Sequence, residues 1–412
     1  MNNSHLSSSN KYIDIAIDKL KLADDLATLI KTPDREIHVE LPLVLDNGSL
    51  HNFVGYRVQH NNSRGPCKGG VAFYPSVTIE DTRAVAELMT YKSALHNLPF
   101  GGAHGAVRCN TKKLSKLEQE RLTKLYTAKI DCFLGPNLDI PGPDLYTDSQ
   151  TMSWILDEYS KRHEFKPACV TGKPLELFGS HLRGKGAALG IVSLLMEHCK
   201  RKDKDFAELT FAVNGFGEVG YNTASLISSF GGKVVSIADS SGAIWQEEGL
   251  NIEWLKSHKD SSGSINDFAN SSAIDKDEQC FLDVDVLVLA SLSEHINLQN
   301  VEKVKAGLIV EASNIAISFE ANQILEDAGK DILPDILVNA GGLIVSYFEW
   351  IQNIQQFKWQ ESAIEEELFK ILLNSYEQAV QVSESENCSL RIASYMIAAR
   401  GLAACTQLRG YQ

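Results

Sequence analysis

The sequence lacks several features that would assign it to a specialised class of protein. No apolar run approaches the roughly 20 residues that span a bilayer, and residues 1–10 lack the apolar segment of a signal peptide. The eight cysteines are scattered without a Cys-x-x-Cys pair, so neither a zinc site nor a disulfide framework is indicated. No basic patch offsets the net charge of −14, which argues against nucleic acid as a partner. We therefore expect a soluble, cytoplasmic protein with reduced thiols.

What the chain does contain is enough apolar sequence for more than one core. It has 412 residues, of which 44% are hydrophobic, so disorder of the whole chain is excluded. A single core stops growing near ~250–300 residues, and this length therefore indicates two domains.

The first half of the sequence predicts a mixture of helices and strands with many turns. Apolar residues at helical spacing predict a helix over 12–31 that ends at Thr32-Pro33. Alternating stretches at 37–45 and 50–59 flank Asp46-Asn47-Gly48, which predicts a hairpin. A further helix is expected from the N-cap Thr78 towards His96. Glycine- and proline-rich turns follow at 64–70, 99–106, 135–144 and 171–174.

From about residue 184 the sequence alternates between strands and helices, as a parallel α/β sheet does. The expected helices are 185–199 and 219–230, the expected strands are 209–213 and 233–238, and later apolar runs at 284–290, 307–310 and 336–338 complete the sheet. Residues 257–278 are rich in Ser, Asn and Asp and read as an exposed connection, and the chain is expected to be helical after Tyr347.

A glycine-rich turn after the first of these strands predicts a dinucleotide site. It reads Gly215-Phe216-Gly217-Glu218-Val219-Gly220 and opens a helix, whose N-terminus would face the phosphates. Asp239, at the end of the next strand, is placed to hold a ribose hydroxyl pair and weakly favours NAD over NADP. The pattern alone is also compatible with a tight structural turn, and Glu218 is mildly unfavourable beside an anion. The strand, helix and acid together favour the nucleotide.

Motifs along nearly the whole chain resemble those of the glutamate dehydrogenases of the Glu/Leu/Phe/Val dehydrogenase family. They are Arg64-Gly65-Pro66-Cys67-Lys68-Gly69-Gly70, Leu88-Met89-Thr90-Tyr91-Lys92, Leu98-Pro99-Phe100-Gly101-Gly102-Ala103, Asp139-Ile140-Pro141-Gly142-Pro143-Asp144, Val170-Thr171-Gly172-Lys173-Pro174, Asn339-Ala340-Gly341-Gly342 and Ser346-Tyr347-Phe348-Glu349-Trp350. The resemblance implies an α/β fold of two domains, a substrate and oligomerisation domain and a Rossmann dinucleotide-binding domain. It also implies a homohexamer and reversible NAD(P)-dependent deamination of glutamate to 2-oxoglutarate and ammonia.

The resemblance assigns roles to four residues. Lys68 matches the lysine that binds the side-chain carboxylate of the substrate, assisted by Ser346, and Lys92 matches the lysine on the α-carboxylate. Leucine dehydrogenases are apolar at the first position, so Lys68 favours glutamate. Asp144 matches the aspartate that moves protons to and from the amine and water. The alternatives are solvated surface lysines and an ordinary turn aspartate.

The sequence departs from the family at the catalytic lysine. The turn that ordinarily reads G-G-A-K-G-G is here Gly101-Gly102-Ala103-His104-Gly105-Ala106. The family lysine polarises the carbonyl and stabilises the developing oxyanion. A histidine with an ordinary pKa of ~6.5 is mostly neutral in the cytosol, so the charge of that cation is lost.

Other departures concern residues that the family places around the nicotinamide. The usual A-T-G-R-G is Gly186-Ala187-Ala188-Leu189-Gly190, without the threonine and the arginine, and the usual A-A-L-E-N is Ala290-Ser291-Leu292-Ser293-Glu294. In the usual E-G-A-N-G-P-T-T segment, Asn314 is retained, but residues 315–318 read Ile-Ala-Ile-Ser.

Three interpretations remain open at this stage. The first is a glutamate dehydrogenase that uses NAD, with NADP not excluded, and in which His104 and Asp144 are the catalytic pair. The second is a catalytically impaired homologue with a binding, regulatory or assembly role, and the third is a dehydrogenase of another amino acid. The expected domains are residues 1–182, completed by a C-terminal helix over 390–412, for the substrate, and 183–389 for the dinucleotide.

Overall fold

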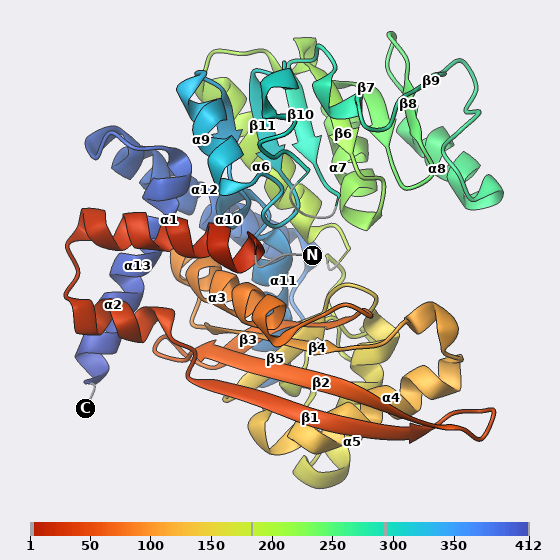
Figure 1. Cartoon of the computed structure of the whole chain (residues 1–412), viewed down its shortest axis with the longest axis vertical. Coiled ribbons are helices and arrows are strands. Elements are labelled where there is room, and N and C mark those ends of the chain that lie inside the picture. Colours follow the sequence, from red (N-terminus) through yellow and green to blue (C-terminus); the bar gives the residue numbers. More distant parts are fainter. Residues whose placement is uncertain (1–3, 183, 292–294, 411–412) are drawn as a thin grey trace. The chain divides into compact units, whose positions relative to one another are not determined.

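The computed structural model describes residues 4–182, 184–291 and 295–410, and divides the chain into two compact units (Figure 1). The first unit comprises Met1–Arg183, Leu343–Glu366 and Tyr395–Gln412, and the second comprises Gly184–Gly342 and Glu367–Ser394. The division after residue 183 lies one residue from the boundary expected from the sequence. Leu343–Glu366 differs from that expectation, because it belongs to the first unit, where Tyr347 and Trp350 pack against Phe100.

The first unit is built on a five-stranded sheet. Its strands are β1 (Arg35–Val44), β2 (Leu50–Asn61), β3 (Cys67–Phe73), β4 (Gly101–Val107) and β5 (Asp139–Pro143), in the order β1-β2-β4-β3-β5. β1 and β2 form the predicted antiparallel hairpin, in which Gly48 takes the left-handed φ of 82° that the turn requires. β3 runs parallel to both β4 and β5, so that the carboxyl ends of these three strands meet at one edge.

Helices cover this sheet on both faces. They are α1 (Ser4–Leu20), α2 (Asp24–Lys31), α3 (Ile79–Leu95), α4 (Lys116–Ile130) and α5 (Ser149–His163). Aromatic and aliphatic side chains of α4 and α5 form one core with Leu41, Phe53, Val71 and Val107 of the strands. The single helix expected over 12–31 is wrong, because Lys21 adopts a left-handed φ of 54° and separates α1 from α2.

The second unit has a seven-stranded sheet. Its strands are β6 (Thr210–Asn214), β7 (Lys233–Ala238), β8 (Ala243–Trp245), β9 (Ser272–Ile274), β10 (Val286–Leu289), β11 (Leu308–Glu311) and β12 (Asp331–Leu333), in the order β12-β11-β10-β6-β7-β8-β9. The strands from β12 to β7 are parallel, whereas β8 and β9 are antiparallel. The chain passes from β6 to β7 on one side and later to β10 on the other, so the strand order reverses at β6, as in dinucleotide-binding folds.

The remaining helices follow the sequence prediction closely, with two corrections. They are α6 (Gly186–Arg201), α7 (Glu218–Ser229), α8 (Ile252–Ser262), α9 (Phe319–Asp327), α10 (Asp335–Val338), α11 (Gly341–Gln355), α12 (Glu361–Ser385) and α13 (Leu390–Arg409). The apolar run 336–338 is helix α10 and not a strand, because Pro334 precedes a helical turn that opens at Asp335. The stretch 257–278 is not wholly a connection, since α8 and β9 occupy part of it.

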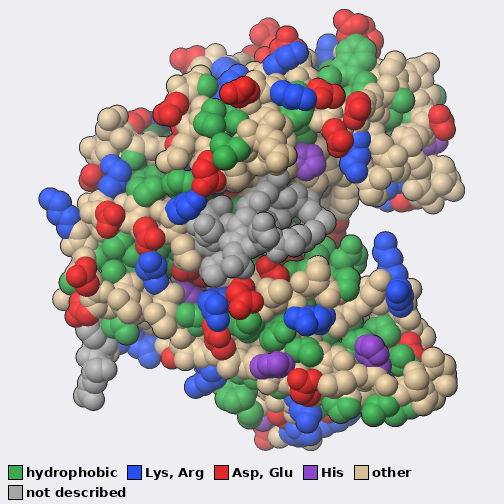
Figure 2. Space-filling view, viewed as in Figure 1, with side chains coloured by type: hydrophobic (Ala, Val, Ile, Leu, Met, Phe, Trp, Pro, Cys, Tyr) green, Lys and Arg blue, Asp and Glu red, His purple; other side chains and the backbone are tan. Residues whose placement is uncertain are grey.

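Three further features concern the hydropathy of the helices, the charged surface and the cysteines of the described residues. No helix among them is long and apolar enough to cross a membrane. Figure 2 shows acidic and basic side chains interspersed on the face that it presents. All eight cysteines lie in the described part of the chain as free thiols, of which only Cys132 is exposed and Cys388 and Cys405 are partly buried.

Candidate active site

Three predicted site residues lie on one face of the first sheet. Lys68 of β3 pairs with Gly102 of β4 and with Ile140 of β5. Side chains two positions apart in a strand lie on the same face of the sheet. His104 is two positions after Gly102, the partner of Lys68, and therefore lies on the same face as Lys68. Asp144 follows the end of β5 and completes the set at the edge where the three strands end.

Glycines make room for these side chains. A Cβ placed on Gly142 would lie 2.9 Å from Lys68 Nζ and 3.4 Å from Thr171 Oγ1. A Cβ on Gly70 would lie 2.6 Å from Asp144 Oδ2. The amine of Lys68 and the carboxylate of Asp144 therefore occupy space that any other residue at the two glycines would fill.

The two predicted substrate lysines are buried, and neither is a surface charge. Lys68 is 3% exposed and Lys92 is 4% exposed. Lys92 lies in the last turn of α3, which begins with a capping box between Thr78 and Asp81, so the predicted N-cap is confirmed. Helix α3 lies so close to β4 that a Cβ on Gly102 would meet the backbone of α3. Buried lysines are uncommon, and a buried ammonium group is chemically suited to bind an anionic ligand.

His104 is enclosed and uncharged. Its side chain is 5% exposed, and burial lowers its pKa to about 4, although Asp144 acts in the opposite direction. Its Nδ1 lies 3.8 Å from Asp144 Oδ2, too far for a hydrogen bond, and finds no partner among the described residues. The structure adds to the sequence prediction, because burial of His104 favours the neutral ring over the cation near neutral pH.

Asp144 combines a turn role with an accessible carboxylate. Its Oδ1 accepts the backbone N–H of Leu145 at 2.7 Å, and its own N–H donates to Thr147 Oγ1 at 2.8 Å. The side chain remains 42% exposed, and it does not cap a helix, since Asp148 is the N-cap of α5. The turn fixes the carboxylate and leaves Oδ2 facing His104, which is compatible with proton transfer.

An ion pair that the sequence did not single out connects two of the motifs. Lys173 Nζ lies 2.6 Å from Glu349 Oε1 with both side chains fully buried, and Glu349 Oε2 accepts the N–H of Gly172 at 2.9 Å. Glu349 lies on α11, the helix that also carries the buried Ser346. The pair thus fixes the loop of Thr171 to the helix of Ser346. Both residues stood inside recognised motifs, which is the signal that could have identified them.

A second buried pair supports the strands. Arg57 on β2 makes a two-pronged contact with Asp139, at 2.8 Å from Nε and 2.5 Å from Nη2, and donates from Nη1 to the carbonyl oxygen of Gly70. Gln59 donates to the same carboxylate. These bonds fix the start of β5 and the middle of β3, the strands that carry Asp144 and Lys68.

In the second unit, the three glycines of the predicted turn have the three roles that a dinucleotide requires. Gly215 has a left-handed φ of 106°, and a Cβ there would lie 2.6 Å from the backbone of Ala290. At Gly217, the N-cap of α7, a Cβ would meet nothing within 4 Å, so the backbone is open to a phosphate. A Cβ on Gly220 would lie 1.8 Å from the carbonyl oxygen of Gly215, which shows close packing of helix on turn. These residues fit the pyrophosphate of a nicotinamide dinucleotide.

The other two predicted cofactor residues lie at the carboxyl ends of two parallel strands of the same sheet, β7 and β11, which are separated by β6 and β10. Asp239 follows β7, where its carboxylate accepts hydrogen bonds from Ser241 and pairs with Lys259 Nζ at 2.6 Å. Lys259 was not expected from the sequence, because it falls in the stretch interpreted as a connection. Asn314 follows β11 and is exposed, with its Oδ1 accepting from Asn339 Nδ2 at 2.9 Å.

The altered segment after β11 keeps a strained backbone. Ile315, where the family has glycine, takes a left-handed φ of 50°, which is costly for a β-branched residue. Its N–H donates to Asp335 Oδ2 at 2.9 Å, and Asp335 is held with Glu311 by the buried Arg391. The loop thus has a left-handed residue although an isoleucine, and not a glycine, stands there. Of the segment 290–294, residues 292–294 lie outside the described residues.

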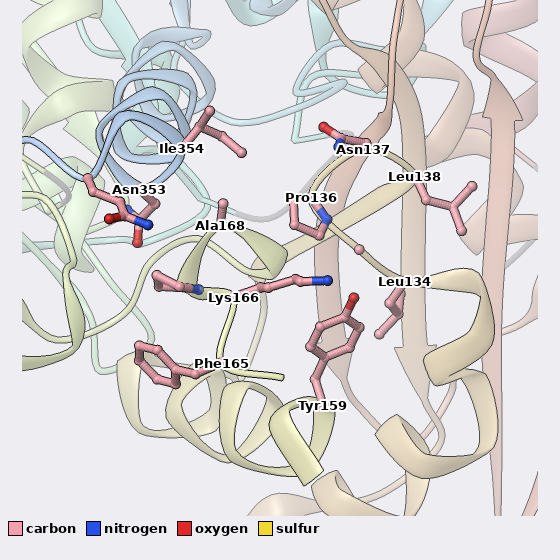
Figure 3. A pocket seen from close by; sticks show the side chains of 13 residues that line it. Leu134, Pro136, Asn137, Leu138, Tyr159, Phe165, Lys166, Ala168, Asn353 and Ile354 are labelled. Atoms are coloured by element: carbon pink, nitrogen blue, oxygen red, sulfur yellow. The ribbon is translucent and has the colours of Figure 1, made fainter. Parts of the chain in front are cut away.

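A separate cavity of about 470 Å³ lies elsewhere in the first unit (Figure 3). Its walls are the loop 134–138 before β5, the segment 165–168 and the end of α11, with Lys166 extended across it towards Tyr159. None of the described residues that line it is a predicted site residue.

Comparisons with known proteins agree with this arrangement. Residues 179–410 match the Glutamate/Leucine/Phenylalanine/Valine dehydrogenase family, and residues 33–161 match the Glu/Leu/Phe/Val dehydrogenase dimerisation domain. The chain is 38% identical over 410 residues to the cryptic catabolic NAD-specific glutamate dehydrogenase GudB of Bacillus subtilis (strain 168), covering 98% of this chain and 96% of that protein.

Solved structures show the same similarity. The hetero-hexameric glutamate dehydrogenase of Thermus thermophilus in a leucine-bound form has a TM-score of 0.95 and 34% identity, with 100% of this chain and 98% of that one covered. The glutamate dehydrogenase of Peptoniphilus asaccharolyticus has a TM-score of 0.86 and 31% identity, covering 99% of this chain and 100% of that one. The predicted family and the two-domain α/β fold are confirmed: the chain belongs to the Glu/Leu/Phe/Val dehydrogenase family and is a homologue of glutamate dehydrogenases.

Proposed function

We propose that this protein catalyses reversible NAD(P)-dependent oxidative deamination of L-glutamate to 2-oxoglutarate and ammonia, at a rate limited by His104. The observation that carries the proposal is the buried Lys68, with its amine over Gly142, on the same sheet face as Asp144 and His104. A buried cation beside a positioned carboxylate suits a substrate that has both an acidic group and a proton to transfer.

We assign a role in this reaction to each candidate site residue of the first unit. Lys68, assisted by Ser346, binds the side-chain carboxylate, and Lys92 binds the α-carboxylate. Asp144 takes up and returns protons at its carboxylate. His104, being neutral, can donate one hydrogen bond to the developing oxyanion but supplies no charge.

The second unit holds the dinucleotide through its glycine-rich turn, Asp239 and Asn314. When bound, the nicotinamide would accept the two electrons that the amino acid loses. We further propose a hexamer, as in the hetero-hexameric relative, and a cytoplasmic location, which suits eight free cysteines.

A second candidate function is that of an impaired homologue that binds its ligands and acts through assembly or regulation. The observation that favours it is the uncharged state of His104, whose burial holds the pKa near 4. Loss of one oxyanion donor costs ~10²–10³ in rate in comparable sites, so a neutral residue here leaves a slow enzyme or a silent one.

The test measures NADH oxidation with 2-oxoglutarate and ammonium for the wild type, His104→Lys and His104→Gln. We expect slow turnover by the wild type and a gain of about 10- to 10³-fold for His104→Lys, because the lysine restores a cation. His104→Gln is the matched control, since it changes the side chain without adding charge and should give no gain.

Two results would decide against the proposal. Wild-type turnover within the ordinary ~1–10³ s⁻¹ of enzymes, unchanged by His104→Lys, would show that His104 does not limit the rate. If no variant turns over but all quench NADH fluorescence on binding, the chain is a binding protein and not an enzyme.

A further inference from the structure

Lys259 occupies an unexpected place in the dinucleotide half of the molecule. It projects from α8 with its side chain only 26% exposed, and its Nζ lies 2.6 Å from Asp239 Oδ2. The same amine donates to the carbonyl oxygen of Phe216 at 3.0 Å and lies 5.5 Å from the centre of that ring. Phe216 is the second residue of the glycine-rich turn. Lys259 therefore connects the turn fitted to the pyrophosphate with the acid fitted to the ribose.

Asp239 has little acceptor capacity left for a ribose. A carboxylate has about four lone-pair positions. Oδ1 already accepts both the N–H and the hydroxyl of Ser241, at 2.7 and 2.6 Å. Oδ2 is buried and forms an ion pair with Lys259 Nζ at 2.6 Å, without an aligned hydrogen bond. Oδ1 is therefore occupied and Oδ2 is enclosed, whereas an acid that holds the 2′- and 3′-hydroxyls together needs two accessible positions.

The charge of Asp239 is also balanced. Burial alone would raise the pKa of Asp239, but the interactions with Lys259 and Ser241 outweigh it and hold the pKa below its ordinary value. The acid is therefore ionised beside a cation, and the pair has no net charge. An unpaired acid at this place would repel a 2′-phosphate, whereas a neutral ion pair would not repel it. Lys259 also places a cation near the exposed residues Ser240 and Ser241, whose hydroxyls can bind a phosphate.

We propose that Lys259 makes the adenosine-ribose subsite accept a 2′-phosphate, so that the protein binds NADP about as well as NAD. The inference rests on the proposed function only in assuming a dinucleotide in the second unit. It revises the expectation from Asp239 alone, which favoured NAD.

The first experiment uses the unaltered protein and measures binding, not turnover. Titrations with NADH and NADPH, followed by their fluorescence, should give dissociation constants within about tenfold of each other. Adenosine 2′,5′-bisphosphate should displace NADH at least as well as ADP does. The affinity for NADPH should fall more steeply with salt than that for NADH, because the extra contact is between charges.

The second experiment removes the cation. Lys259→Met keeps the apolar stem but leaves Asp239 unpaired, so it should weaken NADPH binding by at least 30-fold while NADH binding stays the same or becomes tighter. Lys256→Met is the matched control, because Lys256 lies on the same helix, pairs with Asp260 and does not contact Asp239. It should leave both dissociation constants unchanged.

The outcomes separate the two proposals. Wild-type protein that binds NADH but discriminates against NADPH by 100-fold or more overturns the role of Lys259 and leaves the dehydrogenase proposal intact. Equal weakening of both dinucleotides by Lys259→Met shows a structural clamp and also overturns it. Binding of neither dinucleotide overturns the dehydrogenase proposal itself. If Lys259→Met does not fold, the displacement by adenosine 2′,5′-bisphosphate decides alone.

Discussion

Glu87 on α3 should make the stability of the first unit depend on pH in an unusual direction. Its side chain is buried, its Oε2 has no partner among the described residues, and its Oε1 lies 3.8 Å from the neutral ring of His60. Burial raises the pKa of Glu87 to about 8, with Lys31 opposing the shift and Asp14 adding to it. The folded protein therefore keeps a protonated carboxyl up to about pH 8.

The sign and size of the effect follow from proton linkage. An unfolded chain ionises this group above about pH 4.5, so between that value and pH 8 the unfolded state binds fewer protons than the folded state, and the folded state loses stability as pH rises. The full difference corresponds to about 5 kcal/mol at pH 8 and above, as an upper bound. Glu87→Gln removes the ionisation, so it should stabilise the protein by about 2–4 kcal/mol at pH 8.5 and by much less at pH 5.

Thermal unfolding of the wild type and Glu87→Gln from pH 5 to 8.5 measures this. A gain of 1 kcal/mol raises Tm by roughly 2–4 °C for a unit of ~150–250 residues, so the Tm of the variant should be about 4–16 °C higher at the alkaline end. Glu377→Gln, an exposed position on α12, is the control and should show no such trend. A difference between wild type and Glu87→Gln that is equal at pH 5 and pH 8.5 would refute the reasoning, because it would mean that Glu87 is not held protonated by the fold.

Two further substitutions test the loop after β11 and the pair beneath the substrate face. Ile315→Gly should be more stable than Ile315→Ala by about 1 kcal/mol in chemical denaturation. Both variants lose the isoleucine side chain, but only glycine adopts the left-handed backbone without strain. The opposite order of stability would show that the loop is not strained. Lys173→Met leaves Glu349 buried without its cation and should cost about 3–5 kcal/mol, measured in the same way, whereas the double change with Glu349→Leu should recover much of that loss.

The sequence identified those parts of the fold that local chemistry decides. The hairpin was predictable because Asp46-Asn47-Gly48 provides a residue that accepts positive φ, and α3 was predictable because Thr78 caps it. The dinucleotide turn was predictable because a side chain at any of its three glycines would collide with the backbone or obstruct the approach of a phosphate. The candidate substrate residues came from motifs, and burial of Lys68 then removed the alternative of a surface charge.

The parts that could not be predicted depend on contacts between distant residues. Lys21 ends α1 in a left-handed conformation without the glycine that usually marks such an end. The run at 336–338 has the length of a strand, but it becomes α10, whose first residue, Asp335, is bound by Arg391 from α13. Lys259 of α8 contacts both Asp239 and the glycine-rich turn, and the composition of the stretch 257–278 gives no sign of this contact.

The glycines around His104 have a consequence for substitutions at that position. Strand β4 is closely packed at three glycines: an added side chain would collide with neighbouring backbone at Gly101 and Gly102, and with the side chains of Tyr126 and Arg57 at Gly105. Position 104 is thus defined by atoms that belong to other residues, so one side chain there can be exchanged for another without moving the strand. We therefore expect a single replacement at position 104 to change the charge there while the strand, the lysines and the dinucleotide turn stay as they are.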